Sequence, residues 1–138
     1  MRKLYLDDER TPTEKGWDVV RNYEEFVAYI DKNAMPDIVS FDHDLAPEHY
    51  HNDMYKGQAV YNLLYKTFKK KTGLACAQYI GEILSGSGEQ VPQFNVHSQN
   101  PAGGKNIKDH LLIVMLHNGE DPEVTMNEIP FTLTKKKR

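Results

Sequence analysis

Short apolar runs separated by polar stretches define the pattern of this chain. Four of these runs are rich in β-branched and aromatic residues, which predicts strands. They occupy residues 3–7, 17–21, 37–42 and 94–97, and a similar run at 131–133 predicts a last edge strand.

Apolar positions recur at helical spacing between these runs. Asn22 has a side chain that can cap a helix, and it precedes a predicted helix over 23–33 with acidic residues in its first turn. Two further helices are predicted over 74–85 and 105–117. Strands that alternate with helices predict a parallel α/β sheet with right-handed crossovers, in one domain over residues 1–138.

Residues 46–71 form the least regular part of the pattern. Proline, histidine, tyrosine and asparagine at 47–52 indicate a loop, followed by a short helix between 55 and 68. A connection of this length inside a small domain is usually functional. We therefore expect an insertion, with the role of a lid over a ligand. The predicted helix would carry Tyr61, Leu64, Tyr65 and Phe68 on one face.

Composition narrows the class of protein. The net charge of −3 gives no general attraction to nucleic acid, so nucleic acid is not an expected partner. The single cysteine, Cys76, excludes an internal disulfide and favours the reducing cytoplasm. No apolar run approaches the roughly 20 residues of a membrane span, so a membrane is not expected either. The C-terminal extension, 119–138, ends in a basic stretch typical of a solvated terminus.

Carboxylates follow two of the predicted strands. Asp7 and Asp8 come after the first run, and Asp42 and Asp44 come after the third. Aspartate commonly caps turns and helices, which explains one such pair. Two pairs at equivalent strand ends favour a different reading, because parallel strands deliver their carboxyl ends to one edge of a sheet. Hard oxygen ligands there predict a divalent cation, with Mg²⁺ or Mn²⁺ as the leading candidates.

Two histidines are predicted at the same edge. His43 lies between two aspartates, and His97 ends the fourth run. A single histidine is more often structural, but two at one edge could act as general acid and base on opposite oxygens of a phosphodiester.

The other histidines, His49, His51, His110 and His117, have the setting of surface or loop residues. An alternative for the loop is that two of them, His49 and His51, bind a metal ion together with Asp53.

Candidate phosphate ligands lie beside the acidic residues. Arg10 follows the first pair and either balances its charge or binds a phosphate through its guanidinium fork. Ser98 and Asn100 lie where the fourth strand gives way to a glycine-bearing loop and a helix start, a position that favours phosphate.

Four segments resemble the family of cyclic-phosphate processing receiver-like domains, which are similar to two-component receivers. These segments are LDDERTP at 6–12, FDHDL at 41–45, TG at 72–73 and HSQNPAG at 97–103. The resemblance covers about residues 3–116 and implies a three-layer receiver-like, or flavodoxin-like, parallel sheet with 46–71 inserted. It also implies metal-assisted hydrolysis of a small nucleotide-derived cyclic phosphate.

The resemblance implies a role for each motif. Asp8 and Asp42 would hold the metal with help from Asp7. Catalysis would fall to the histidines and the acidic neighbour of one of them: His43, Asp44 and His97. The substrate would be bound by Arg10, Thr72, Gly73, Ser98 and Asn100.

One departure from phospho-accepting receivers separates two hypotheses. Asp42 matches the phospho-acceptor and Ser98 the hydroxyl residue, but 129–131 has no equivalent of the lysine that receivers carry at the last strand. Phosphoryl signalling is therefore disfavoured, and the added histidines favour hydrolysis. The alternative is a non-catalytic receiver-like module that binds or sequesters a cyclic nucleotide. The sequence does not define the oligomeric state.

Overall fold

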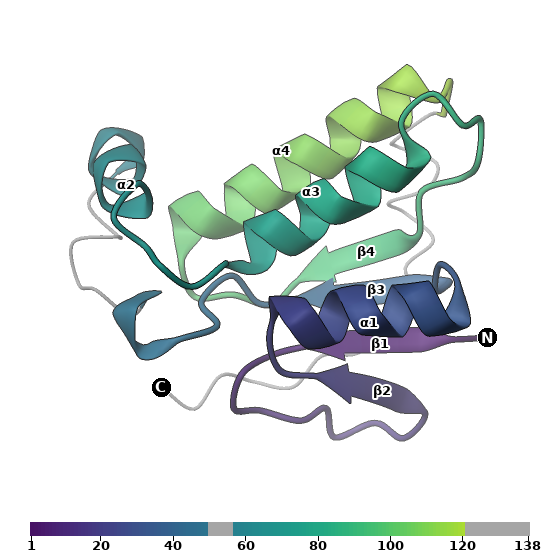
Figure 1. Ribbon diagram of the computed structural model, residues 1–138, viewed down its shortest axis with the longest axis horizontal. Helices are drawn as coiled ribbons and strands as arrows, with labels where there is room; N and C mark the ends of the chain where they lie inside the picture. The colour runs from purple at the N-terminus through teal and green to yellow at the C-terminus, as the bar shows by residue number, and fades with distance from the viewer. Residues whose placement is uncertain (50–56, 121–138) are drawn as a thin grey trace.

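The computed structural model describes residues 1–49 and 57–120. Its four strands form one parallel sheet in the order β2-β1-β3-β4 (Figure 1). The strands are β1 (Lys3–Leu6), β2 (Trp17–Val20), β3 (Ile38–Phe41) and β4 (Gln93–Val96). The α/β class and the receiver-like sheet predicted from the sequence are confirmed, and each strand boundary lies within one residue of its prediction. The predicted strand at 131–133 lies outside the described residues.

The core lies between the sheet and three helices, α1 (Tyr23–Asn33), α3 (Gly73–Leu84) and α4 (Pro101–His117). All four residues of β3 are buried, and Val39 and Phe41 belong to the apolar cluster that packs against the helices. Leu6 and Phe41 contribute to the same apolar cluster as residues from the three helices. The single cysteine, Cys76, is fully buried in this cluster. The outline of this arrangement is visible in Figure 1, where α3 and α4 run side by side.

The helix after β4 begins earlier than predicted. The sequence favoured a loop through the glycines at 103–104 and a helix from 105, but α4 starts at Pro101. Asn100 caps it by accepting a hydrogen bond from the Gly103 N–H at 2.9 Å. Proline in the first turn is tolerated because its nitrogen would have no helical partner there. The boundary prediction was wrong because capping outweighed the glycine pair.

The described part of 46–71, the segment predicted to be an insertion, contains a short 3₁₀ turn, η1 (Pro47–His49), and a helix, α2 (Gln58–Tyr65). The predicted helix is therefore confirmed, and Tyr61 is its buried residue. Among the described helices, none combines the length and apolar character needed to cross a membrane.

Candidate active site

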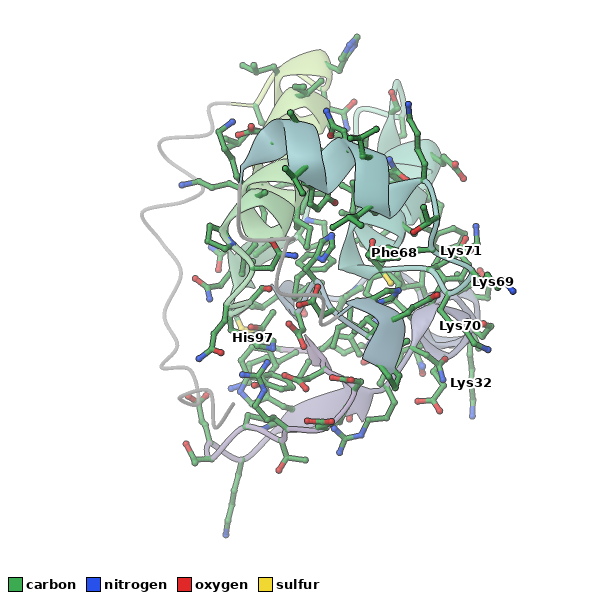
Figure 2. The ribbon with its side chains drawn as sticks, turned by 90° about the vertical axis from the view of Figure 1, so that its left-hand side faces the viewer. Lys32, Phe68, Lys69, Lys70, Lys71 and His97 are labelled. Atoms are coloured by element: carbon green, nitrogen blue, oxygen red, sulfur yellow. The ribbon has the colours of Figure 1, made fainter. Side chains whose placement is uncertain are left out.

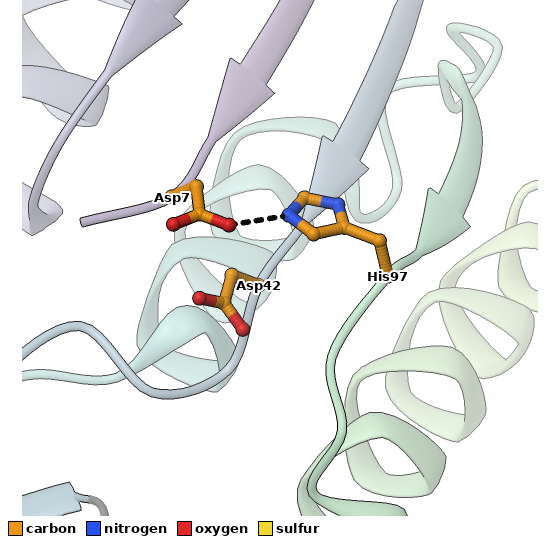
Figure 3. Close-up of side chains that lie close together, drawn as sticks. All are labelled: Asp7, Asp42 and His97. Atoms are coloured by element: carbon orange, nitrogen blue, oxygen red, sulfur yellow. Dashed lines mark hydrogen bonds and ion pairs between the residues drawn. The ribbon is translucent and has the colours of Figure 1, made fainter. Parts of the chain in front are cut away.

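Three side chains meet where the strands β1, β3 and β4 end (Figure 3). Asp7, Asp42 and His97 each follow the last residue of a strand, and the register carries on past these ends. The Asp42 N–H donates to the Leu6 carbonyl at 2.9 Å, and the His97 N–H donates to the Phe41 carbonyl at 2.9 Å. Backbone pairing therefore fixes the three residues at one level of the sheet edge.

These three residues could hold a metal ion. Each offers one ligand atom, and the ligand atoms of Asp7, Asp42 and His97 all lie within 4.8 Å of one another. All three residues are buried. Asp8, which the sequence placed in the metal site, is only half-buried and is not part of this group in the described structure. The donor set suits a divalent cation but does not define which one.

Arg10 lies between the two carboxylates. Its Nε is 2.7 Å from Asp7 Oδ2, and its Nη2 is 3.2 Å from Asp42 Oδ2. The side chain is 6% exposed, and among the described residues its Nη1 has no hydrogen-bond partner. Burying a guanidinium nitrogen without an acceptor is costly, and an anion would supply that acceptor. The guanidinium thus supplies the positive charge that the two aspartates require.

Asp7 acts in two ways at once. Its Oδ1 accepts hydrogen bonds from the N–H groups of Glu9 and Arg10, both at 2.9 Å, which is the turn-capping role expected of aspartate. Its Oδ2 faces Arg10 and His97. Burial alone would raise the pKa of Asp7, but hydrogen bonds from His97 and from these backbone groups, with the charge of Arg10, hold its pKa well below the usual range. Asp7 is therefore a carboxylate.

His97 is fixed through both ring nitrogens. Nε2 lies 3.1 Å from Asp7 Oδ2 and donates to it, so Nδ1 accepts from the Ser40 hydroxyl at 2.7 Å. The ring also stacks on Tyr5, with centroids 4.4 Å apart and planes 7° from parallel. The sequence interpretation missed both neighbours. Ser40 carried a signal, since it is the polar residue inside the apolar run of β3.

His43 is not part of the group of Asp7, Asp42 and His97, and it is closed off from solvent. It is fully buried, with Nδ1 2.8 Å from Asp44 Oδ1 and Nε2 2.7 Å from the Tyr61 hydroxyl. Asn100 Nδ2 donates to the same Asp44 oxygen at 3.3 Å. The carboxylate fixes the tautomer with a proton on Nδ1, so Tyr61 donates to Nε2. The insertion therefore reaches the site through Tyr61, a residue that the sequence predicted only as part of a helix face.

The predicted substrate residues shape the helix starts at this edge. Thr72 caps α3, accepting from the Leu74 N–H at 3.2 Å. Gly73 lies so close to the sheet edge that an added Cβ would be 1.9 Å from the Asp42 carbonyl oxygen. Asn100 caps α4, and the Ser98 hydroxyl accepts from the Asn100 N–H at 3.0 Å. These contacts place Thr72 and Gly73 at the start of α3 and Ser98 and Asn100 at the start of α4, and their binding of substrate remains a prediction.

The prediction that His49 is a surface or loop residue was wrong about its exposure. His49 is fully buried; its Nδ1 accepts from the Leu45 N–H at 2.8 Å, and its Nε2 donates to the Lys70 carbonyl at 2.8 Å. Burial lowers its pKa, so the ring is neutral. With both nitrogens engaged, His49 ties η1 to the end of the insertion. His51 and Asp53, its proposed partners in metal binding, lie outside the described residues. His117 is exposed as predicted, and His110 is half-buried.

Comparison with known proteins defines the class that this fold and site belong to. Residues 2–112 match the cyclic-phosphate processing receiver domain. The chain belongs to that family, as the four sequence segments indicated. No curated protein and no solved structure matches the chain.

Proposed function

We propose that this protein is a metal-dependent phosphoesterase that hydrolyses a nucleotide-derived cyclic phosphate. The observation that carries the proposal is the buried group of Asp7, Asp42 and His97, within 4.8 Å of one another, beside Arg10. The free Nη1 of Arg10 supplies a donor for a phosphate oxygen. Membership of the cyclic-phosphate processing family supplies the class of substrate.

The residues present fit a divalent cation. Asp7 and Asp42, with Asp8 beside them in the chain, would hold Mg²⁺ or Mn²⁺ through carboxylate oxygens. The ion would supply charge neutralisation and activation of a water. Arg10 lies against both carboxylates. Once an ion neutralises the charge of the carboxylates, the guanidinium would release them and bind the phosphate. Ser98, Asn100, Thr72 and Gly73 would complete the phosphate site at the two helix starts.

Hydrolysis requires two proton transfers. A water oxygen bonds to phosphorus, one ring P–O bond breaks, a base takes the water proton and an acid protonates the leaving oxygen. His97 carries a proton on Nε2, which faces the carboxylate group, so we assign it the acid. His43, oriented by Asp44, would be the base, because the lone pair on its Nε2 becomes available once the Tyr61 hydroxyl no longer donates to it.

A substrate panel tests the proposal. Nucleoside 2′,3′-cyclic phosphates and ADP-ribose cyclic phosphate are incubated with Mg²⁺ or Mn²⁺, and the phosphomonoester product is measured. Asp42→Asn is the control. We expect turnover with at least one substrate, abolished by chelation. Equal signals from wild type and Asp42→Asn on every substrate would refute it.

A second candidate is a module that binds the cyclic nucleotide without cleaving it. The observation that favours it is that both histidines have both ring nitrogens engaged. Calorimetry with the same panel, followed by chromatography of the ligand, separates the two. Tight binding with intact ligand supports sequestration, whereas recovery of a monoester supports catalysis.

A further inference from the structure

A basic cluster lies at the end of the insertion, away from the carboxylates. It consists of Lys69, Lys70 and Lys71, three consecutive exposed residues just before Thr72. Within the described parts of the chain, no acidic side chain forms an ion pair with any of the three. Figure 2 shows these lysines gathered with Phe68 on one side of the molecule, while His97 lies on the other side of the same view.

Aromatic rings line the space beside these lysines. A hollow of about 290 Å³ is bordered by the three lysines, by Tyr65 and Phe68, and by the first half of α3. Tyr65 and Phe68 are half-buried, with ring centroids 5.8 Å apart in an edge arrangement. Phe68 is supported from behind by His49, whose ring centroid is 4.7 Å away. The rings are therefore held in place by the core of the insertion.

A second hollow continues the surface on the other side of the lysine run. Its volume is about 200 Å³, it shares Lys70 and Lys71 with the first, and it includes Tyr23. Lys71 Nζ lies 4.8 Å from the centroid of the Tyr23 ring. The two hollows thus meet at Lys70 and Lys71, which line both of them.

The backbone of this lysine run is fixed. Glu48 Oε2 accepts hydrogen bonds from the N–H groups of Lys69 and Lys70, at 2.9 and 2.6 Å. The Glu48 carboxylate thus pairs with main-chain N–H groups, and the side chains of Lys69 and Lys70 remain exposed.

We propose that the strip formed by Tyr65 and Phe68 with Lys69–Lys71 binds a single-stranded nucleic acid segment. Bases would stack on the rings while successive phosphates contact the lysines, the combination that single-strand binders use. An acidic peptide would use the charge but not the rings. The net charge of −3, which argued against nucleic acid, is a sum over the whole chain. A local cluster of lysines can be basic within such a chain. The proposal does not depend on catalysis at the carboxylate group.

Fluorescence anisotropy with a labelled single-stranded hexauridylate tests it on the full chain. Three lysine contacts predict a log–log salt slope of about −2, at roughly 0.7 per phosphate. Lys69→Gln with Lys70→Gln should reduce the slope to about −0.7. Phe68→Leu keeps the packing on His49 but removes the stacking face, and should weaken binding roughly ten-fold at an unchanged slope.

Matched controls isolate the strip. Lys15→Gln with Lys108→Gln removes two exposed lysines elsewhere and should leave the affinity unchanged. Replacing the four basic residues of 135–138 by glutamine should also leave it unchanged. Asp42→Asn should bind the oligonucleotide normally, which keeps this test separate from that of hydrolysis. Loss of binding only in the 135–138 variant, or equal competition by polyglutamate of matched charge, would overturn the proposal.

Discussion

Arg10 and Asp7 form the closest charged contact of the site, with the guanidinium Nε 2.7 Å from Asp7 Oδ2. The same guanidinium reaches Asp42, so one side chain occupies the charge position that a bound cation would take. An arginine and a metal ion would therefore compete for the same two carboxylates. Under the proposed function, this relationship would make Arg10 the residue that couples metal binding to phosphate binding.

Replacing Arg10 should change stability and metal affinity in opposite directions. Arg10→Gln leaves two buried carboxylates without a cation, which should cost about 3–5 kcal/mol of unfolding free energy without metal. It also removes the competing charge, so we expect Mg²⁺ or Mn²⁺ to bind roughly ten-fold more tightly. Calorimetry and thermal unfolding with and without chelator measure both effects. Arg2→Gln is the control, because Arg2 is an exposed arginine whose guanidinium donates to the carbonyls of Ala34 and Met35, between α1 and β3. Weaker metal binding by Arg10→Gln would contradict competition.

His97→Gln should separate proton transfer from metal binding. If oxygen ligands hold Mg²⁺, removing the imidazole should lower hydrolysis by a factor of roughly 100 or more while Mg²⁺ affinity changes little. Trp17 offers an optical readout of metal binding, since its ring contacts Tyr5 at 5.8 Å and Tyr5 stacks on His97. A parallel fall in metal affinity and activity would instead make His97 a ligand.

His49 should make the fold sensitive to mild acid. Its pKa is lowered in the folded state from an ordinary value of 6.5, because burial disfavours the charged ring. The unfolded chain then binds the proton more readily, so stability is fully present above about pH 6.5 and falls as the pH drops toward the folded pKa. Protonation would also cost the hydrogen bond that Nδ1 accepts from the Leu45 N–H.

Urea unfolding of wild type and His49→Phe between about pH 5 and pH 8 measures this. The phenyl ring keeps the contact with Phe68 but removes both nitrogens and the titration. We expect the variant to lose about 2 kcal/mol near neutral pH and to show a smaller decline toward pH 5. His117→Gln, which replaces an exposed histidine, should retain the wild-type profile. An identical pH dependence in wild type and His49→Phe would show that His49 is not responsible.

The sequence predicted the strand ends and their meeting because both depend on local pattern and on the parallel register. Asp7, Asp42 and His97 each follow an apolar run, and parallel pairing brings such positions to one edge. The contacts of Tyr61 with His43 and of Ser40 with His97 were not predictable in this way. They join residues far apart in the chain, and their geometry is set by how the insertion and the sheet pack.

Gly103 is another residue whose role the sequence pattern did not predict. Its role depends on a contact with a residue distant in the chain, and not on its position in a helix. The glycines at 103 and 104 are consecutive residues of α4, and the sequence treated them alike. A Cβ added to Gly103 would lie 2.4 Å from His43 Cγ, whereas one added to Gly104 would lie 3.2 Å from Val96 Cγ1. The first neighbour is a buried ring fixed at both nitrogens, and the second is a methyl group at the end of a strand.

Gly103→Ala and Gly104→Ala therefore form a matched pair. Alanine favours a helix over glycine by up to about 1 kcal/mol, so Gly104→Ala should be neutral or slightly stabilising. Gly103→Ala gains the same propensity but forces His43 to shift, and we expect a net loss of about 1–3 kcal/mol. Chemical denaturation gives both values, and the imidazole NMR signals of His43 should move only in Gly103→Ala. Equal stability of the two variants would mean that the His43 ring yields freely, which its bonds to Asp44 and Tyr61 oppose.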